Sequence, residues 1–310
     1  MADGPLDTII LGGGPAGLTA GLYAARARVN AILLEKGLPG GSPLSTDIIE
    51  NYPGFPDGVT GAELGERMQA QAERFGLEMR TLVGANKVVA ADGAYRVETD
   101  EEPFLARSVI VAVGARPNRL GVPGEEEYVG RGVSFCATCD GAMFRDRIVA
   151  VVGGGNAAIE EAIFLTRFAS KVLVVHRRDA LRAVPVLQEQ AFANEKIEFL
   201  WNSELKRVDG NDVVTGIEVC NRKTGVATRL NVQGVFIYIG TVPNSDVVAD
   251  LVELDGRGFI KTDTSLMTSS PGIFACGDVR AGHPRQVVIA TGEGAVAQMS
   301  AQRYLSELEG

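Results

Sequence analysis

Two cysteines separated by only two residues are the side chains of this sequence best suited to redox chemistry. Cys136 and Cys139 stand in the stretch C-A-T-C-D, in which Asp140 follows directly. Cysteines at this spacing can close a small disulfide that exchanges readily with outside thiols. Asp140 is placed to move a proton to or from a leaving thiolate. We therefore expect a redox-active pair at these positions.

Two other uses of such a pair are a zinc site and a purely structural disulfide. Zinc would need two more ligands, but the other cysteines are isolated in the sequence and the chain has only two histidines. A structural disulfide would be unusual in a cytoplasmic protein and would stabilise it little, because the closed loop is so short. We therefore favour redox chemistry and expect no metal site.

Two glycine-rich turns could bind the phosphate groups of nucleotide cofactors. The first carries the pattern G-x-G-x-x-G and the second the pattern G-x-G-x-x-A. The small residues of the two patterns are Gly12, Gly14, Gly17, Gly153, Gly155 and Ala158. Glycine makes the turn tight and lets the backbone approach a pyrophosphate, which N–H groups at the start of a helix then bind. Two such turns predict two dinucleotide sites.

The segments around these turns can be overlaid without a gap, which indicates a repeated unit. Residues 7–36 and 147–178 each contain a β-branched run, the glycine turn, about sixteen residues of helical pattern and a second β-branched run. Each segment is typical of a βαβ unit. The sequence therefore predicts an α/β fold with two Rossmann-like FAD/NAD(P)-binding domains.

The residue at the end of the second strand distinguishes the two expected ligands. Glu35 and His176 are equivalent, because each lies 23 residues after the first glycine of its turn. A carboxylate there accepts hydrogen bonds from ribose hydroxyls, which suits FAD or NAD. His176 instead opens a basic run with Arg177, Arg178 and Arg182, whose guanidinium groups could bind a 2′-phosphate. The second site is therefore predicted to bind NADPH; the alternative is an ordinary solvated basic surface.

Two proline-containing breaks divide the chain. One follows a buried strand pattern at 104–114, and the other follows a matching pattern within 235–246. They predict that residues 118–243 form an NADPH-binding domain that also carries the cysteine pair. This domain would be inserted in a discontinuous FAD-binding domain made of residues 1–117 and 244–310.

The returning C-terminal segment is expected to complete the first site. A strand pattern ends in Gly277 and Asp278; this aspartate could accept hydrogen bonds from a ribityl chain, or could belong to an ordinary strand-end turn. From Val287 onward the sequence reads as a mostly helical C-terminus that glycines interrupt early. If the start of this helix points at the flavin pyrimidine edge, its dipole would stabilise reduced flavin, with Arg285 and Gln286 beside that edge.

Composition and charge narrow the classes of function. Apolar residues make up 45% of the chain and charged residues 22%, as in ordinary folded proteins. The net charge of −9 argues against non-specific binding to nucleic acid or to an anionic membrane. We find no apolar run of about 18 residues and no secretion signal, so we expect a cytoplasmic protein without membrane spans.

As a set, these motifs closely resemble those of low-molecular-weight, bacterial-type thioredoxin reductases, which are class II pyridine nucleotide-disulfide oxidoreductases. The resemblance extends over nearly the whole chain. The matching stretches are GGGPAG at 12–17, GG at 40–41, ENYPG at 50–54, CATCDG at 136–141, GGGNAAIEEA at 153–162, HRRDALR at 176–182, FIYIG at 236–240, and GIFACGD at 272–278 with RQ at 285–286.

The resemblance implies a homodimer with FAD bound tightly in one domain and NADPH in the other. It implies that Cys139 faces the flavin, that Cys136 attacks the disulfide of thioredoxin, and that Asp140 is the general acid. It also implies that the inserted domain rotates to present first the nicotinamide and then the disulfide to the flavin. By position, further FAD contacts fall on Pro15, Ala16, Lys36, Gly40, Gly41, Ser42, Asn51, Gly114 and Val287, and further NADPH contacts on Asn156, Ala157 and Glu160.

The chain departs from the family pattern in two places. Family members commonly read GGQL after the second strand, whereas this chain has Ser42 and Pro43 after its two glycines. It therefore lacks a long amide that could bond the flavin, and the flavin potential or affinity could differ. The stretch VVIATGEG at 287–294 is also less alanine-rich than usual, at the expected flavin edge and dimer contact.

The predicted function is thioredoxin-disulfide reduction, in which NADPH reduces FAD, FAD reduces the Cys136–Cys139 disulfide, and the dithiol reduces thioredoxin. One alternative is a flavin-dependent dithiol oxidase, against which the basic run argues. Another is a reductase of a different thioredoxin-like or peroxidase-linked partner. A nucleotide-sensing protein that keeps the fold without turnover would leave the cysteine pair unused.

Overall fold

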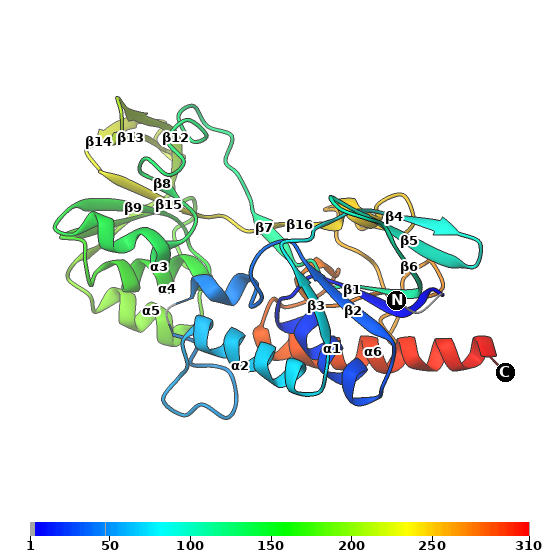
Figure 1. Cartoon of the computed structure of the whole chain (residues 1–310). Coiled ribbons are helices and arrows are strands. Elements are labelled where there is room, and N and C mark those ends of the chain that lie inside the picture. The colour runs from blue at the N-terminus through cyan, green and yellow to red at the C-terminus, as the bar shows by residue number, and fades with distance from the viewer. Residues whose placement is uncertain (1–3, 47, 310) are drawn as a thin grey trace. The chain divides into compact units, whose positions relative to one another are not determined.

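The computed structural model describes residues 4–46 and 48–309, and the chain forms two compact units. The first unit contains the chain up to Arg116 and again from Val242, and the second is Pro117–Thr241. Where the chain passes from one unit to the other, β7 (Ala115–Pro117) and β16 (Thr241–Pro243) pair as a two-stranded ribbon (Figure 1). Each unit has its own sheet and its own apolar cores.

A seven-stranded sheet forms the centre of the first unit, in the order β3, β2, β1, β6, β5, β4, with β17 also paired to β6. The pairs that join β1, β2, β3, β6 and β17 are parallel, whereas β4 and β5 add antiparallel pairs at one side. The strand bounds are β1 (Leu6–Leu11), β2 (Ala31–Glu35), β3 (Glu78–Thr81), β4 (Ala85–Ala91), β5 (Ala94–Thr99), β6 (Phe104–Val111) and β17 (Ile273–Ala275).

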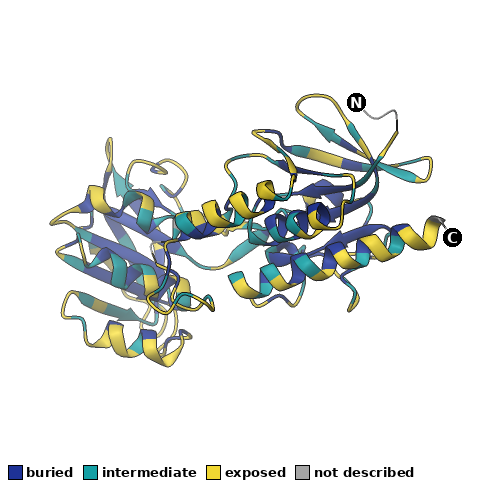
Figure 2. Ribbon diagram, turned by 60° about the horizontal axis from the view of Figure 1, so that its bottom comes forward, coloured by how far each residue is buried: buried dark blue, intermediate teal, exposed yellow. Residues whose placement is uncertain are grey.

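Both faces of this parallel region are covered. Along β1, Ile9 and Leu11 belong to one apolar core, and Ile10 belongs to the core on the opposite face. Strands that are buried on both faces need nearly continuous apolar runs, which β1, β2 and β6 provide. Figure 2 shows these central strands buried and the helices exposed along one side. The helical elements are α1 (Pro15–Arg26), α2 (Gly61–Arg74), α6 (Val287–Glu309), η1 (Ser42–Ser45), η3 (Ser245–Val248) and η4 (Gly277–Val279).

The C-terminal helix differs from the sequence-based expectation. Glycines were expected to interrupt it early, but α6 is continuous over Val287–Glu309, so that expectation was wrong. Gly294 lies against α1, where a Cβ would be only 2.1 Å from the carbonyl oxygen of Ala16. This glycine therefore allows two helices to pack closely and does not end one of them. Its cost in helix propensity is about 1 kcal/mol, which packing along 23 residues can offset.

The second unit contains a five-stranded parallel sheet, in the order β11, β10, β9, β15, β8, and a three-stranded antiparallel sheet of β12, β13 and β14. Its strand bounds are β8 (Val133–Ser134), β9 (Ile148–Gly153), β10 (Lys171–His176), β11 (Ile197–Trp201), β12 (Ser203–Gly210), β13 (Val214–Asn221), β14 (Ala227–Leu230) and β15 (Gly234–Tyr238). Its helical elements are α3 (Ala137–Asp140), η2 (Gly141–Phe144), α4 (Asn156–Leu165) and α5 (Pro185–Phe192).

The two predicted βαβ units are confirmed as β1-α1-β2 and β9-α4-β10, each with parallel strands. Their helices are shorter than the sixteen-residue pattern suggested, with 12 residues in α1 and 10 in α4. In the first unit the helix ends at Arg26, and the chain turns through Arg28 with φ 60° before β2 begins. Among the described residues, no helix is long and apolar enough to cross a membrane.

We predict that Gly17→Ala destabilises the first unit. A Cβ at this position would lie 1.8 Å from the carbonyl oxygen of Gly12, which is fixed between β1 and α1. Overpacking of this severity costs about 3 kcal/mol, which should lower the melting temperature of the cofactor-free protein by about 6 to 12 °C.

Gly14→Ala is the matched control for this measurement. Its Cβ would make only an ordinary contact, 3.7 Å from the Cα of Gly41. Equal melting temperatures for the two variants would contradict the packing argument.

Candidate functional site

The cysteine pair lies at the start of the short helix α3, directly after β8. Cys136 and Cys139 form a disulfide with an S–S distance of 2.06 Å. The sulfur of Cys136 accepts a hydrogen bond from the Cys139 N–H at 3.1 Å. The Ser134 hydroxyl, at the end of β8, accepts the Cys136 N–H at 3.0 Å and donates to the Cys136 carbonyl at 3.1 Å. Cys139 is exposed and Cys136 is half-buried, so the disulfide can be reached from outside this unit.

Tyr238 supports the cysteine pair from the end of β15. Its hydroxyl accepts a hydrogen bond from the Ala137 N–H at 2.9 Å, within the first turn of α3. Burial, together with the nearby Glu161 carboxylate, raises the pKa of Tyr238, which keeps the phenol neutral. Asp140 is half-buried at the end of the same helix. Tyr238 was not predicted as a functional residue, although a tyrosine at the end of a buried strand was an available signal.

The first glycine turn is a place of very close backbone approach. Gly12 has φ 101°, and a Cβ there would lie 2.5 Å from the carbonyl oxygen of Ala112. Gly41 has φ 63°, and its Cβ would lie 2.7 Å from the Cα of Gly14. No side chain caps α1, which begins with Pro15. The N–H groups of its first turn are therefore available to an anionic ligand.

Glu35 lies at the carboxyl end of β2, where it faces this turn. Its carboxylate oxygens accept the N–H of Gly13 at 2.5 Å and the N–H of Gly37 at 2.6 Å. Each carboxylate oxygen has two lone pairs, so both can still accept a hydrogen bond from a ribose hydroxyl. The backbone contacts thus fix the carboxylate at the mouth of the turn.

A second group of predicted residues lies where β17 leads into α6. Gly277, with φ 73°, opens η4 and is followed by Asp278, which is partly exposed. The Asn51 side-chain amide donates to the side-chain oxygen of Gln286 at 3.0 Å, so the loop after β2 contacts the start of α6. Arg285 has φ 55° and stacks its guanidinium over the Phe259 ring at 4.7 Å.

The other residues predicted for the first site lie on or beside these elements. Pro15 and Ala16 open α1, and Val287 opens α6. Gly40 donates its N–H to the Gly13 carbonyl at 2.8 Å. Exposed Lys36 follows β2, exposed Ser42 opens η1, and Gly114, with φ 63°, follows β6.

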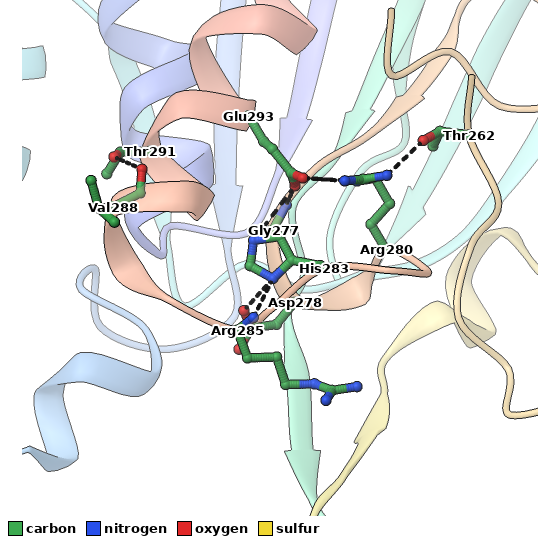
Figure 3. Close-up of polar contacts among 9 residues, drawn as sticks. All are labelled: Thr262, Gly277, Asp278, Arg280, His283, Arg285, Val288, Thr291 and Glu293. Atoms are coloured by element: carbon green, nitrogen blue, oxygen red, sulfur yellow. Dashed lines mark hydrogen bonds and ion pairs between the residues drawn. The ribbon is translucent and has the colours of Figure 1, made fainter. Parts of the chain in front are cut away.

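A buried polar network beside Asp278 was not found by sequence analysis. His283 lies between Asp278 and Glu293, and Arg280 donates to Glu293 from Nε at 3.0 Å (Figure 3). Glu293 also accepts the N–H of Gly277 at 2.8 Å. The signals available in the sequence were the charged residues Arg280, His283 and Glu293 in the segment after Asp278.

The second glycine turn repeats this construction in the second unit. A Cβ on Gly153 would lie 2.4 Å from the carbonyl oxygen of Tyr238 and 2.7 Å from the Cβ of Ala158. No side chain caps α4, whose N-cap is Gly155. The Asn156 side-chain oxygen accepts the Val184 N–H at 2.9 Å, which ties the loop after β10 to the turn. Ala157 and Glu160 lie on the exposed side of α4.

The basic run after β10 divides into one buried and three exposed side chains. Arg177, Arg178 and Arg182 are exposed. His176 is buried beneath the turn, where a Cβ on Gly154 would lie 2.4 Å from its ring. Burial, reinforced by the neighbouring arginines, lowers the pKa of His176. This histidine therefore packs as a neutral ring, and the positive charge at the turn comes from the arginines.

The structure thus gathers the predicted residues into two constellations, one in each unit. In each unit a glycine turn, an uncapped helix start and a polar strand end meet at the carboxyl ends of parallel strands. This is where open α/β sheets bind nucleotides. The second unit adds the disulfide to this arrangement.

Comparison with known proteins agrees with this arrangement. The family model described as pyridine nucleotide-disulphide oxidoreductase matches residues 6–294. A thioredoxin reductase of Listeria monocytogenes is 45% identical over 98% of this chain and 95% of its own length. One from Bacillus subtilis is also 45% identical, over 98% of this chain and 96% of its own length.

A crystal structure of Lactococcus lactis thioredoxin reductase, in a form termed the FR conformation, superposes with a TM-score of 0.95. It is 42% identical, and the match covers 97% of this chain and 99% of that one. The full-length similarity, the shared fold and the disulfide show that this chain belongs to the pyridine nucleotide-disulphide oxidoreductase family, among its low-molecular-weight bacterial thioredoxin reductases.

Proposed function

We propose that the chain uses NADPH and a bound FAD to reduce its own Cys136–Cys139 disulfide, and that the resulting dithiol reduces thioredoxin. The observation that carries this proposal is the disulfide on α3, in the same unit as a glycine turn with an arginine-rich border. One unit thus carries a group that can accept electrons and a site for a nucleotide that can supply them.

The first unit fits FAD. The turn at Gly12 and Gly14, with the uncapped start of α1, would hold the pyrophosphate. Glu35 would accept hydrogen bonds from the adenosine ribose, and Asp278 from the ribityl chain. The start of α6, with Gln286 held by Asn51, would lie at the pyrimidine edge and stabilise negative charge on the reduced ring.

The second unit fits NADPH better than NADH. The turn at Gly153 and Gly155 would hold the pyrophosphate. Exposed Arg177 and Arg178 directly follow His176, which holds the position of Glu35 in the second unit. Guanidinium groups bind a 2′-phosphate that a carboxylate would repel. A flavin held by the first unit would supply the two-electron chemistry that links NADPH to the disulfide.

The protein's own residues would then carry out the thiol–disulfide exchange and supply the proton that it needs. Two electrons and two protons convert the disulfide to the dithiol of Cys136 and Cys139. The Cys136 thiolate, stabilised by the Cys139 N–H, attacks one sulfur of the thioredoxin disulfide and forms a mixed disulfide. Cys139 then attacks the Cys136 sulfur, which releases reduced thioredoxin and restores the starting disulfide. Asp140 would supply the proton for the leaving thiolate.

The second unit would have to move between the two electron transfers, from NADPH to the flavin and from the flavin to the disulfide. The nicotinamide site and the disulfide belong to one unit, and both must reach the same flavin. We infer that the ribbon of β7 and β16 is the hinge for a rotation that presents them in turn. By family membership we also propose a cytoplasmic homodimer. Exposed Val288, Val296 and Met299 on α6 offer apolar surface for the dimer contact.

Serine variants of the cysteine pair test the proposed electron path. Cys139→Ser should abolish NADPH-driven reduction of thioredoxin, because the disulfide can no longer form. Cys136→Ser should do the same, yet in both variants NADPH should still bleach the flavin absorption band, since hydride transfer precedes the disulfide step.

Cys220→Ser is the matched control and should keep full activity, because Cys220 lies on β13, outside both constellations. Thioredoxin reduction that persists in Cys139→Ser would refute the path.

The double variant Arg177→Ala/Arg178→Ala tests the choice of nucleotide. We expect the KM for NADPH to rise about 10- to 100-fold, since charge-assisted hydrogen bonds to a phosphate are lost. The kcat/KM for NADH should stay within about twofold of the wild type, because NADH has no 2′-phosphate. Steady-state kinetics with both nucleotides provide the measurement.

Arg257→Ala is the control, because this exposed arginine lies in the first unit. An unchanged preference for NADPH in the double variant would contradict the assignment of the 2′-phosphate to these arginines.

A further inference from the structure

The imidazole of His283 is fully buried between the end of β17 and the first turns of α6. Its Nδ1 accepts a hydrogen bond from the backbone N–H of Arg285 at 2.9 Å. The same Nδ1 lies 3.3 Å from a carboxylate oxygen of Asp278. Figure 3 shows Asp278 and Arg285 on one side of the ring and Glu293 on the other, with Nε2 3.6 Å from a Glu293 oxygen.

The two neighbours of Nδ1 require different protonation states of that nitrogen. The Arg285 N–H needs a lone pair, which only an unprotonated Nδ1 offers, whereas the Asp278 carboxylate needs an N–H donor. One nitrogen cannot satisfy both. The presence or absence of a proton on Nδ1 therefore decides which of the two contacts is made.

We infer that His283 is a proton-controlled positioning residue for the flavin-binding loop. With Nδ1 unprotonated, His283 holds the Arg285 backbone and leaves Asp278 free to accept hydrogen bonds from the ligand. With both nitrogens protonated, it pairs with Asp278 and Glu293 and releases the Arg285 N–H. This inference rests on the proposed FAD site.

The contact with Arg285 matters because that residue has φ 55°, a conformation that few non-glycine residues adopt. Such a backbone persists only where its surroundings hold it. Arg285 is followed by Gln286 and by α6, so loss of its hydrogen bond would loosen the start of the helix. The same proton would also draw Asp278 away from the ribityl chain, so both effects weaken flavin binding.

The charged groups that face His283 come from both adjoining elements. Asp278 lies on η4 and Arg280 directly follows it. Glu293 lies on α6 and accepts hydrogen bonds from the Gly277 N–H and from Arg280. Burial, with Glu293 nearby, raises the pKa of the Cys276 thiol, so this group stays neutral. Histidine is the side chain whose charge ordinarily changes between about pH 5 and 8. A series from about pH 8 to 5.5 therefore tests the imidazole.

The test compares His283→Ala with His283→Asn in the full-length, flavin-free protein. Asparagine can place an amide oxygen near the position of Nδ1 and accept the Arg285 N–H, but it does not ionise. The affinity for added FAD is measured by quenching of flavin fluorescence. In the wild type it should fall about tenfold across the pH series, the effect of losing about one hydrogen bond.

His283→Ala should bind FAD about tenfold more weakly already at pH 8, and His283→Asn should bind well without this pH dependence. The only other histidine, His176, lies in the second unit and is unchanged in both variants. Wild-type affinity in His283→Ala, or a wild-type pH profile in His283→Asn, would overturn the inference.

A second readout does not need the flavin. In the amide NMR spectrum of the flavin-free protein, the Arg285 N–H resonance should shift across the same pH series in the wild type and stay in place in His283→Asn. If the wild type binds no FAD, the proposed function fails, and this resonance still decides the role of His283. Equal shifts in the two proteins would refute that role.

Discussion

The structure depends on very close backbone contact at the glycine turns that follow β1 and β9. A single methyl group at Gly17 or Gly153 would lie within 2.5 Å of a carbonyl oxygen of the neighbouring strand or turn. Without that contact, the helix starts would move away from the strand ends and could no longer present N–H groups to a pyrophosphate. In the second unit, Tyr238 also extends this constraint to the redox pair. Its carbonyl lies against Gly153, and its hydroxyl holds the Ala137 N–H beside the disulfide.

Charge distinguishes the two constellations, although their backbones are built alike. The first is bordered by carboxylates that backbone N–H groups hold in place. Glu35 accepts hydrogen bonds from two backbone N–H groups, and Glu293 accepts one from a backbone N–H and another from the Arg280 side chain. The second is bordered by exposed arginines in a chain with a net charge of −9. The charges around each glycine turn, and not the net charge of the chain, therefore favour binding of FAD in one unit and of a phosphorylated nicotinamide nucleotide in the other.

Sequence patterns predicted the features that are local in the chain. The βαβ units and the disulfide were predictable because strand runs, glycine turns and cysteine spacing involve residues that are close in sequence. Individual contacts between distant segments were not predictable. The early glycines were expected to interrupt the C-terminal helix, because the approach of α1 to Gly294 shows only in the folded chain. Tyr238 lies about 100 residues from the Ala137 N–H that it accepts, and His283 depends on Glu293 from another element.

The proposed electron flow from NADPH through flavin to thioredoxin can be followed in an anaerobic titration. The purified flavoprotein would receive NADPH or NADH and then oxidised thioredoxin, while absorption of the flavin band is followed. We expect bleaching by NADPH in preference to NADH, and recovery of the band when thioredoxin is added. If neither nucleotide bleaches the flavin, the proposed electron path is wrong, and a dithiol oxidase or another electron donor would have to replace it.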